Sequence, residues 1–179
     1  METKVKEKGS DWLPRVTVRH IQAQDLYALE WEGEFTHFRR VYWEAYQRSR
    51  LGSAVLWVAE LKPVGIIGQV FIQLVCDRPE LANGSSHAYL YSFRVRPEYR
   101  NAGLGSYIMD VVEQDLFRRG FHYVTLNVAK DNPQAQRLYE RRGYKVVAHE
   151  PGYWSYIDEK GRWQSVEEPA WRMEKRLER

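Results

Sequence analysis

A glycine-bearing turn at residues 95–106 carries the clearest chemical signal in this sequence. It reads Val-Arg-Pro-Glu-Tyr-Arg-Asn-Ala-Gly-Leu-Gly-Ser and leads from an apolar segment into an amphipathic one. A helix that begins there directs several backbone N–H groups and the positive end of its dipole at one point, which suits a phosphorylated ligand. Gly103 and Gly105 keep that point free of side chains, and Arg100 can add a charge-assisted contact.

Two other phosphate-binding patterns do not fit this turn. A dinucleotide-binding fingerprint requires a third glycine where the sequence has Ile108, and a Walker A loop requires a Gly-Lys-Ser/Thr run that the sequence lacks. A plain strand-to-helix turn, in which the glycines serve backbone geometry only, stays open from these residues alone.

A second segment follows at residues 132–144 and reads Asn-Pro-Gln-Ala-Gln-Arg-Leu-Tyr-Glu-Arg-Arg-Gly-Tyr. It resembles the N-x-x-A-x-x-L-Y-x-x-x-G-F pattern of the GNAT superfamily of N-acetyltransferases, with Tyr144 in place of phenylalanine. The turn at 95–106 resembles the acyl-CoA-binding turn of the same family, and the likeness is clearest over residues 87–146. The resemblance implies an enzyme that moves an acetyl group from acetyl-CoA to a primary amine of a small molecule or a peptide, by direct attack in a ternary complex.

The resemblance also implies which residues bind acetyl-CoA. In the family, the strand before the turn carries a bulge or splay that frees backbone groups for the pantetheine arm, and the turn holds the pyrophosphate. The corresponding residues here are Phe93, Arg94 and Val95 for the arm, and Arg100, Asn101, Ala102, Gly103, Leu104, Gly105 and Ser106 for the pyrophosphate. Asn127, Asn132 and Tyr139 complete the set, and Asn132 is also expected to cap a helix.

Tyr139 is the candidate general acid. When an amine attacks the thioester, the intermediate expels a thiolate, and a phenol with an ordinary pKa of about 10 is protonated at neutral pH and can supply the proton. The alternative is that Tyr139 only packs beside Leu138 in the core. The general base is open, because the two carboxylates familiar from the family are replaced here by Tyr89 and Asn127.

Glu34 and Glu30 are candidate bases or amine-binding groups, since the N-terminal helical segment borders the acceptor pocket in this family. Glu32, His37, His87 and a water chain along Tyr89 and Tyr91 stay open as other sources of the base. A solvated helix face is the simplest alternative role for the acidic residues. The missing carboxylates also keep a non-catalytic acyl-CoA-binding sensor or interaction module as the alternative function.

Composition limits the class of protein. The 179 residues, 44% of them hydrophobic, fit one domain with a sizeable core. The net charge of +3 does not favour nucleic acid as a partner, because 27 basic residues meet 24 acidic ones. Cys76 is the only cysteine, which excludes an intrachain disulfide, and the scattered histidines predict no metal site. A charged start and the lack of a long apolar run predict a cytoplasmic protein with no membrane association.

The elements that must position these residues follow from periodicity. Residues 1–14 are expected to form a flexible tail and residues 15–179 a single domain. Alternating or continuous apolar runs predict strands over 15–20, 54–60, 64–75, 87–96, 122–128, 145–149 and 170–177. Helical spacing predicts two helices within 25–49, separated at Gly33, and one each over 104–116 and 133–142, and a short hairpin is expected at 158–161.

The resulting order, β-α-α-β-β-β-α-β-α-β-β, indicates an α/β domain with one mixed sheet and helices on both faces. The resemblance implies the single-domain GNAT fold, with a mostly antiparallel twisted sheet of about seven strands. Aromatic residues, 14% of the chain, concentrate in the regions 31–46 and 153–171, which approach each other in that fold. We expect them to fill the core and to cover the surface of a homodimer, with an aromatic-walled acceptor pocket as the alternative.

Overall fold

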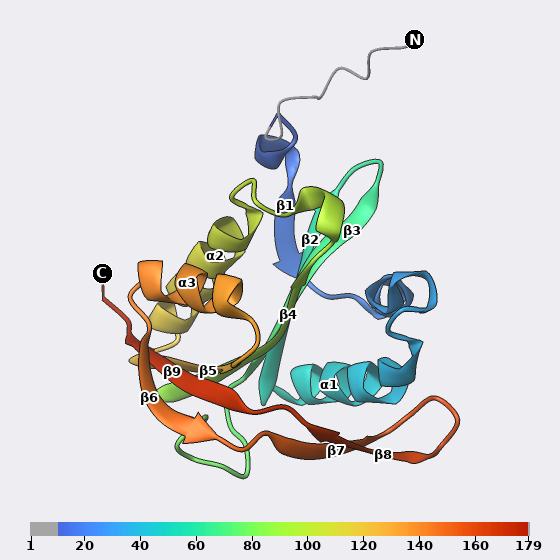
Figure 1. Cartoon of the computed structure of the whole chain (residues 1–179). Coiled ribbons are helices and arrows are strands. Elements are labelled where there is room, and N and C mark those ends of the chain that lie inside the picture. The colour runs from blue at the N-terminus through green and yellow to red at the C-terminus, as the bar shows by residue number, and fades with distance from the viewer. Residues whose placement is uncertain (1–10, 179) are drawn as a thin grey trace.

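A seven-stranded sheet forms the centre of the computed structural model, which describes residues 11–178 (Figure 1). Its strands lie in the order β1-β2-β3-β4-β5-β9-β6. Their bounds are β1 Thr17–His20, β2 Ala54–Leu61, β3 Gly65–Gln73, β4 His87–Val95, β5 Tyr123–Ala129, β6 Lys145–Glu150 and β9 Ala170–Arg176. Every neighbouring pair is antiparallel except β4 and β5, which are parallel. The expected mixed, mostly antiparallel sheet is confirmed.

Helices cover both faces of this sheet (Figure 1). Helix α1, Arg39–Leu51, packs on one face, and helices α2, Leu104–Arg118, and α3, Pro133–Arg141, lie on the other. Strand β3 is apolar almost throughout because both of its faces are buried. Ile67 joins the core beneath α2, and Phe71 joins the core beneath α1. No helix within residues 11–178 is long and apolar enough to cross a membrane.

The first helical segment differs from the expectation of two α-helices separated at Gly33. It is a 3₁₀ helix over Ala23–Gly33, followed by a short 3₁₀ turn over Thr36–Phe38 that leads into α1. Within this segment Trp31 and Glu32 adopt positive φ angles of 47° and 54°, so the interruption is a kink at these two residues. Left-handed backbone at two successive non-glycine residues interrupts any regular helix, whatever the spacing of its apolar side chains.

The expected hairpin at 158–161 is confirmed and is longer than the sequence indicated. Its strands, β7 Tyr153–Ile157 and β8 Trp163–Glu167, form a separate two-stranded sheet that the expected order of elements left out. The carboxylate of Asp158 shapes the turn by accepting hydrogen bonds from the backbone N–H groups of Lys160 and Arg162. The hairpin extends away from the main sheet and runs beside α1 (Figure 1).

Residues 11–14, which belong to the expected tail, are described, and two of them contact the glycine turn. Residues 1–10 of the expected tail lie outside the described residues. Trp12, however, packs edge-to-face on Tyr99 with ring centroids 5.0 Å apart. A Cβ placed on Gly103 would lie 3.5 Å from a side-chain carbon of Leu13. This segment therefore contacts the outer side of the glycine turn.

Candidate active site

Strands β4 and β5 diverge in the middle of the sheet. They pair from His87 opposite Tyr123 to Leu90 opposite Leu126, and no further pair follows although both strands continue. Strand β4 also carries a β-bulge. Tyr91 pairs with Phe71 of β3, and Arg94 pairs with Gln69, so Ser92 and Phe93 stand opposite a single residue of β3. Ser92 adopts a φ of 51° at this bulge. The divergence leaves an opening between the two strands.

The backbone of Val95 faces this opening. The N–H of the next residue, Arg96, donates to the carbonyl of Ile67 on β3 at 2.8 Å. Because the backbone groups of successive strand residues point in opposite directions, the N–H and C=O of Val95 point away from β3. The carbonyl accordingly accepts a hydrogen bond from Nε of Arg100 at 2.7 Å.

The glycine turn brings the start of α2 to the edge of this opening. Asn101 and Gly103 have φ angles of 59° and 93°, which turn the chain sharply into the helix. The first hydrogen bond of the helix runs from the N–H of Tyr107 to the carbonyl of Gly103. The three preceding N–H groups, of residues 104–106, have no acceptor within the described part of the chain. N–H groups left unpaired at the start of a helix can donate hydrogen bonds to an anion.

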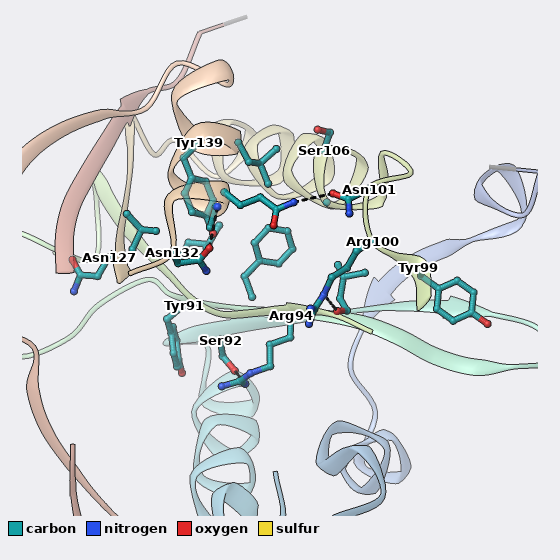
Figure 2. A pocket seen from close by; sticks show the side chains of 18 of the residues that line it. Tyr91, Ser92, Arg94, Tyr99, Arg100, Asn101, Ser106, Asn127, Asn132 and Tyr139 are labelled. Carbon is teal, nitrogen blue, oxygen red and sulfur yellow. Dashed lines mark hydrogen bonds between the residues drawn. The ribbon is translucent and has the colours of Figure 1, made fainter. Parts of the chain in front are cut away.

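A cavity of about 870 Å³ occupies the opening, with the start of α2 at one end. Eleven of the thirteen residues expected to bind acetyl-CoA line it: Phe93, Arg94, Val95, Arg100, Asn101, Gly103, Gly105, Ser106, Asn127, Asn132 and Tyr139. Ala102 and Leu104 do not line the cavity, and the Leu104 side chain is buried in the core. Figure 2 shows Asn101, Ser106, Asn132 and Tyr139 grouped on one side of β4. The tertiary structure thus gathers residues from three separate segments.

Comparisons with known proteins agree with this arrangement. The model of the acetyltransferase (GNAT) family matches residues 21–144, which is more than half of the chain. The chain belongs to the acetyltransferase (GNAT) family. The matched residues include the first helical segment, the opening between β4 and β5, and α3.

Solved structures of GNAT proteins share the fold at low sequence identity. Ard1 from Thermoplasma volcanium superposes with a TM-score of 0.70 at 18% identity, over 92% of this chain and 99% of that one. The ribosomal-protein-S18-alanine N-acetyltransferase from Escherichia coli gives 0.68 at 19%, over 92% and 95%. The spermidine/spermine N-acetyltransferase SpeG from Vibrio cholerae gives 0.67 at 18%, over 92% and 94%. These likenesses show the fold.

Tyr139 of this GNAT chain lies on α3 and faces the opening. Its side chain is 7% exposed and packs edge-to-face on Tyr144, with ring centroids 5.8 Å apart. Burial, followed by the nearby phenol of Tyr89, raises the pKa of Tyr139 well above its ordinary value of 10. The phenol is therefore protonated throughout the neutral pH range and has a proton to give.

Two asparagines lie at the same end of the opening. Oδ1 of Asn132 accepts from the N–H of Ala135 at 3.2 Å, as expected for a helix cap. Nδ2 of Asn127 lies 3.4 Å from the Tyr89 hydroxyl, and Oδ1 of Asn127 is buried with no hydrogen-bond partner among residues 11–178. That unpartnered oxygen can accept a hydrogen bond from a bound molecule.

The structure separates the two candidate glutamates. Glu34 lines the cavity, whereas Glu30 does not. Glu30 is buried, and both of its carboxylate oxygens accept hydrogen bonds from Arg39 at 2.9 Å. Hydrogen bonding from Arg39 holds the pKa of Glu30 below its ordinary value of 4.5. Glu30 is therefore a structural partner of Arg39 and is a poor proton acceptor.

Five polar cavity residues were missed by the sequence analysis: Ser92, Tyr99, Gln134, Arg141 and Glu168. Tyr91 from the suggested water chain also lines the cavity, as do Trp31 and Phe35 from the early aromatic region. Gln134 follows the capping Asn132, and its Nε2 donates to Oδ1 of Asn101 at 3.1 Å, which links α3 to the glycine turn. The early and late aromatic regions do meet, because Phe38 lies 5.0 Å from Tyr156 between ring centroids. No group of His, Cys, Asp or Glu side chains in residues 11–178 has the geometry of a metal site.

Proposed function

We propose that this chain transfers an acetyl group from acetyl-CoA to a primary amine by direct attack in a ternary complex. One observation carries the proposal: the opening between β4 and β5 connects the unpaired N–H groups at the start of α2 with the buried phenol of Tyr139. A long, anionic thioester would place its pyrophosphate at the first feature and its sulfur near the second. The match to the acetyltransferase (GNAT) family supports the same choice.

The residues present fit acetyl-CoA. Three N–H groups without an internal acceptor, at residues 104–106, provide donors for the pyrophosphate, and Arg100 adds positive charge beside them. Gly105 sits where a Cβ would contact Phe93 and Leu138 at 3.6 Å, so a larger side chain would enter the opening. The carbonyl of Val95 accepts a hydrogen bond from Nε of Arg100, and its second lone pair can accept one from an amide N–H of the pantetheine arm.

Transfer then requires one bond to form and one to break. The amine nitrogen attacks the thioester carbon, and the carbonyl oxygen gains negative charge that the N–H of Val95 stabilises. Collapse of the intermediate breaks the C–S bond, and Tyr139 donates its proton to the departing sulfur. The proton lost by the amine passes to a base, and solvent restores the proton of Tyr139.

Glu34 is the carboxylate we propose for binding or deprotonating the amine. It lines the cavity, and no Arg or Lys in the described residues is paired with it. A water relay along Tyr89 and Tyr91 is the other route for the proton. Burial raises the pKa of Tyr89 to about 12 and also raises that of Tyr91, so these phenols would act in the neutral form.

Calorimetric titration with acetyl-CoA tests this proposal. The wild type should bind acetyl-CoA in the micromolar range, and a folded Gly103→Glu/Gly105→Glu variant should not, because two carboxylates would occupy the pyrophosphate site. Gln114→Glu, an exposed position on the same helix, controls for added negative charge. Acceptor-dependent CoA release then separates an enzyme from a non-catalytic acyl-CoA-binding module. No binding to the folded wild type would contradict the proposal.

A further inference from the structure

The side chain of Arg94 lies on the opposite side of β4 from the glycine turn. Figure 2 shows Arg94, Ser92 and Tyr91 pointing towards α1, whereas Tyr139 and Ser106 lie on the other side of the strand. The bulge at Ser92 contributes to this placement, because an extra residue in the strand changes the direction of the side chains around it. Arg94 is thus placed away from the pyrophosphate site, although it lines the same cavity.

Neutral contacts hold the guanidinium of Arg94 in place. Its Nη1 donates to the hydroxyl of Tyr42 at 3.0 Å and to Oγ of Ser92 at 2.9 Å. The guanidinium carbon also lies 4.3 Å from the ring centroid of Phe35 and 5.4 Å from that of Phe38. Hydrogen bonds on one edge and aromatic rings on one face orient the group without neutralising its charge.

No carboxylate among residues 11–178 is paired with this guanidinium. Seven other arginines, Arg19, Arg39, Arg78, Arg96, Arg119, Arg142 and Arg172, each form an ion pair with an acidic side chain. Arg94 forms none within 4.0 Å among residues 11–178. Burial raises the pKa of Tyr42, although Arg94 itself lowers it in part, so this partner also stays neutral at neutral pH. An anion bound beside this half-buried, unpaired cation would therefore be stabilised by electrostatic attraction.

One edge of the guanidinium is available for that anion. Nε and Nη2 of Arg94 have no hydrogen-bond acceptor in the described part of the protein, since both of its hydrogen bonds use Nη1. Arg39 uses the equivalent edge, Nε and Nη2, to hold the two oxygens of Glu30. The free edge of Arg94 has the same geometry and can bind a carboxylate in the same bidentate way.

The charges around the cavity suit a molecule with two opposite charges. Glu34 and Glu168, both exposed, line the cavity and attract an ammonium group, while Arg94 attracts a carboxylate. Trp31, Phe35 and Tyr91 supply aromatic surface to the same cavity. A polyamine would bring only positive charge to a cavity that already contains this unpaired guanidinium.

We propose that Arg94 binds a carboxylate of the acetyl acceptor, and that the acceptor is an amino acid: a small amine that also carries a carboxylate. The inference rests on the proposed acetyl transfer and adds the class of acceptor to it. Arg94 acts here as a specificity-determining residue, and its backbone can still contribute to cofactor binding.

Matched acceptors test the inference through acetyl-CoA-dependent CoA release. The panel holds free amino acids, their carboxamides and the amines without the carboxyl group, for example phenylalanine, phenylalaninamide and phenethylamine. The wild type should prefer the carboxylates by about tenfold to a hundredfold in kcat/KM, the usual effect of charged hydrogen bonds. In Arg94→Gln this preference should vanish through a raised KM, while acetyl-CoA affinity is unchanged. Arg96→Gln, whose arginine is paired with Glu32 outside the cavity, should keep the preference.

The outcomes separate this inference from the proposed function. Equal rates with acids and amides, or a preference for amines without a carboxylate, would overturn the role of Arg94 and leave acetyl transfer standing. The proposed function would be overturned if no CoA were released with any member of the panel and none with any other amine. In that case direct calorimetric binding of amino acids decides: binding that Arg94→Gln abolishes supports the carboxylate site, and its absence in the wild type refutes it.

Discussion

Leu90 and Leu126 form the last pair between β4 and β5, and the two strands separate beyond it. Both side chains are buried in the core beneath α2, so the strands are held together up to this point by apolar packing. Beyond it, the bulge at Ser92 turns β4, and the cavity begins. The opening that would admit a thioester is thus a property of the sheet itself and needs no movement of a loop.

Tyr139→Phe should lower kcat at least tenfold and leave the affinity for acetyl-CoA unchanged. The substitution removes the proton that we assign to the leaving thiolate and keeps the buried ring against Tyr144. Because burial raises the pKa of Tyr139, kcat of the wild type should show no loss from deprotonation of this phenol up to about pH 10. Calorimetry and a pH profile of kcat give the two readings, and an unchanged kcat in the variant would remove the general-acid role.

Glu34→Gln should reduce kcat/KM and leave the melting temperature unchanged. Glu34 is exposed, lines the cavity and forms no ion pair with the described residues, so its carboxylate has no structural partner to lose. Acetylation kinetics and thermal melting of the same sample measure the two effects. Alanine at both Glu30 and Glu34 gives the stricter test, since an unchanged kcat/KM would exclude either glutamate as base or amine ligand.

Glu30→Gln should instead lower stability, in a pH-dependent way. Arg39 depresses the pKa of Glu30 in the folded protein, so the ion pair stabilises the fold above the ordinary pKa of 4.5. This contribution is lost as the pH falls through the lower folded pKa. The difference in melting temperature between wild type and variant should therefore be full at pH 7 and shrink below about pH 4.5. A difference that stays constant down to pH 3 would contradict the assignment.

Ser92→Ala should destabilise the fold by about 1–2 kcal/mol in chemical denaturation. The substitution removes the hydroxyl that accepts hydrogen bonds from Nε2 of Gln69 and Nη1 of Arg94, and Gln69 is almost fully buried. Ser92→Gly also removes the hydroxyl but suits the positive φ of 51°. We expect glycine to be the less destabilising of the two by about 1 kcal/mol, and the opposite order would argue against backbone strain at the bulge.

Local chemistry determined much of this protein from the sequence alone. Asn132 caps α3, and Pro133 begins it, as the pattern predicted, because caps and first-turn residues act on backbone groups a few positions away. The turn at 103–106, the strands and the face of α2 that packs on the sheet follow equally from neighbours in the chain. Trp31 and Glu32 are the exception, since their positive φ angles have no such local signal.

Only the tertiary structure decided which of these elements meet. The divergence after Leu90 depends on the register between two strands that are far apart in the sequence. Glu30 and Glu34 look alike in the sequence, yet one faces Arg39 and the other faces the cavity. Arg94 is unpaired for the same kind of reason, because no carboxylate in residues 11–178 lies within 4.0 Å of its guanidinium nitrogens. Strand register, ion pairing and exposure to a cavity all depend on distances between residues that are far apart in the sequence. Patterns among neighbouring residues do not determine these distances.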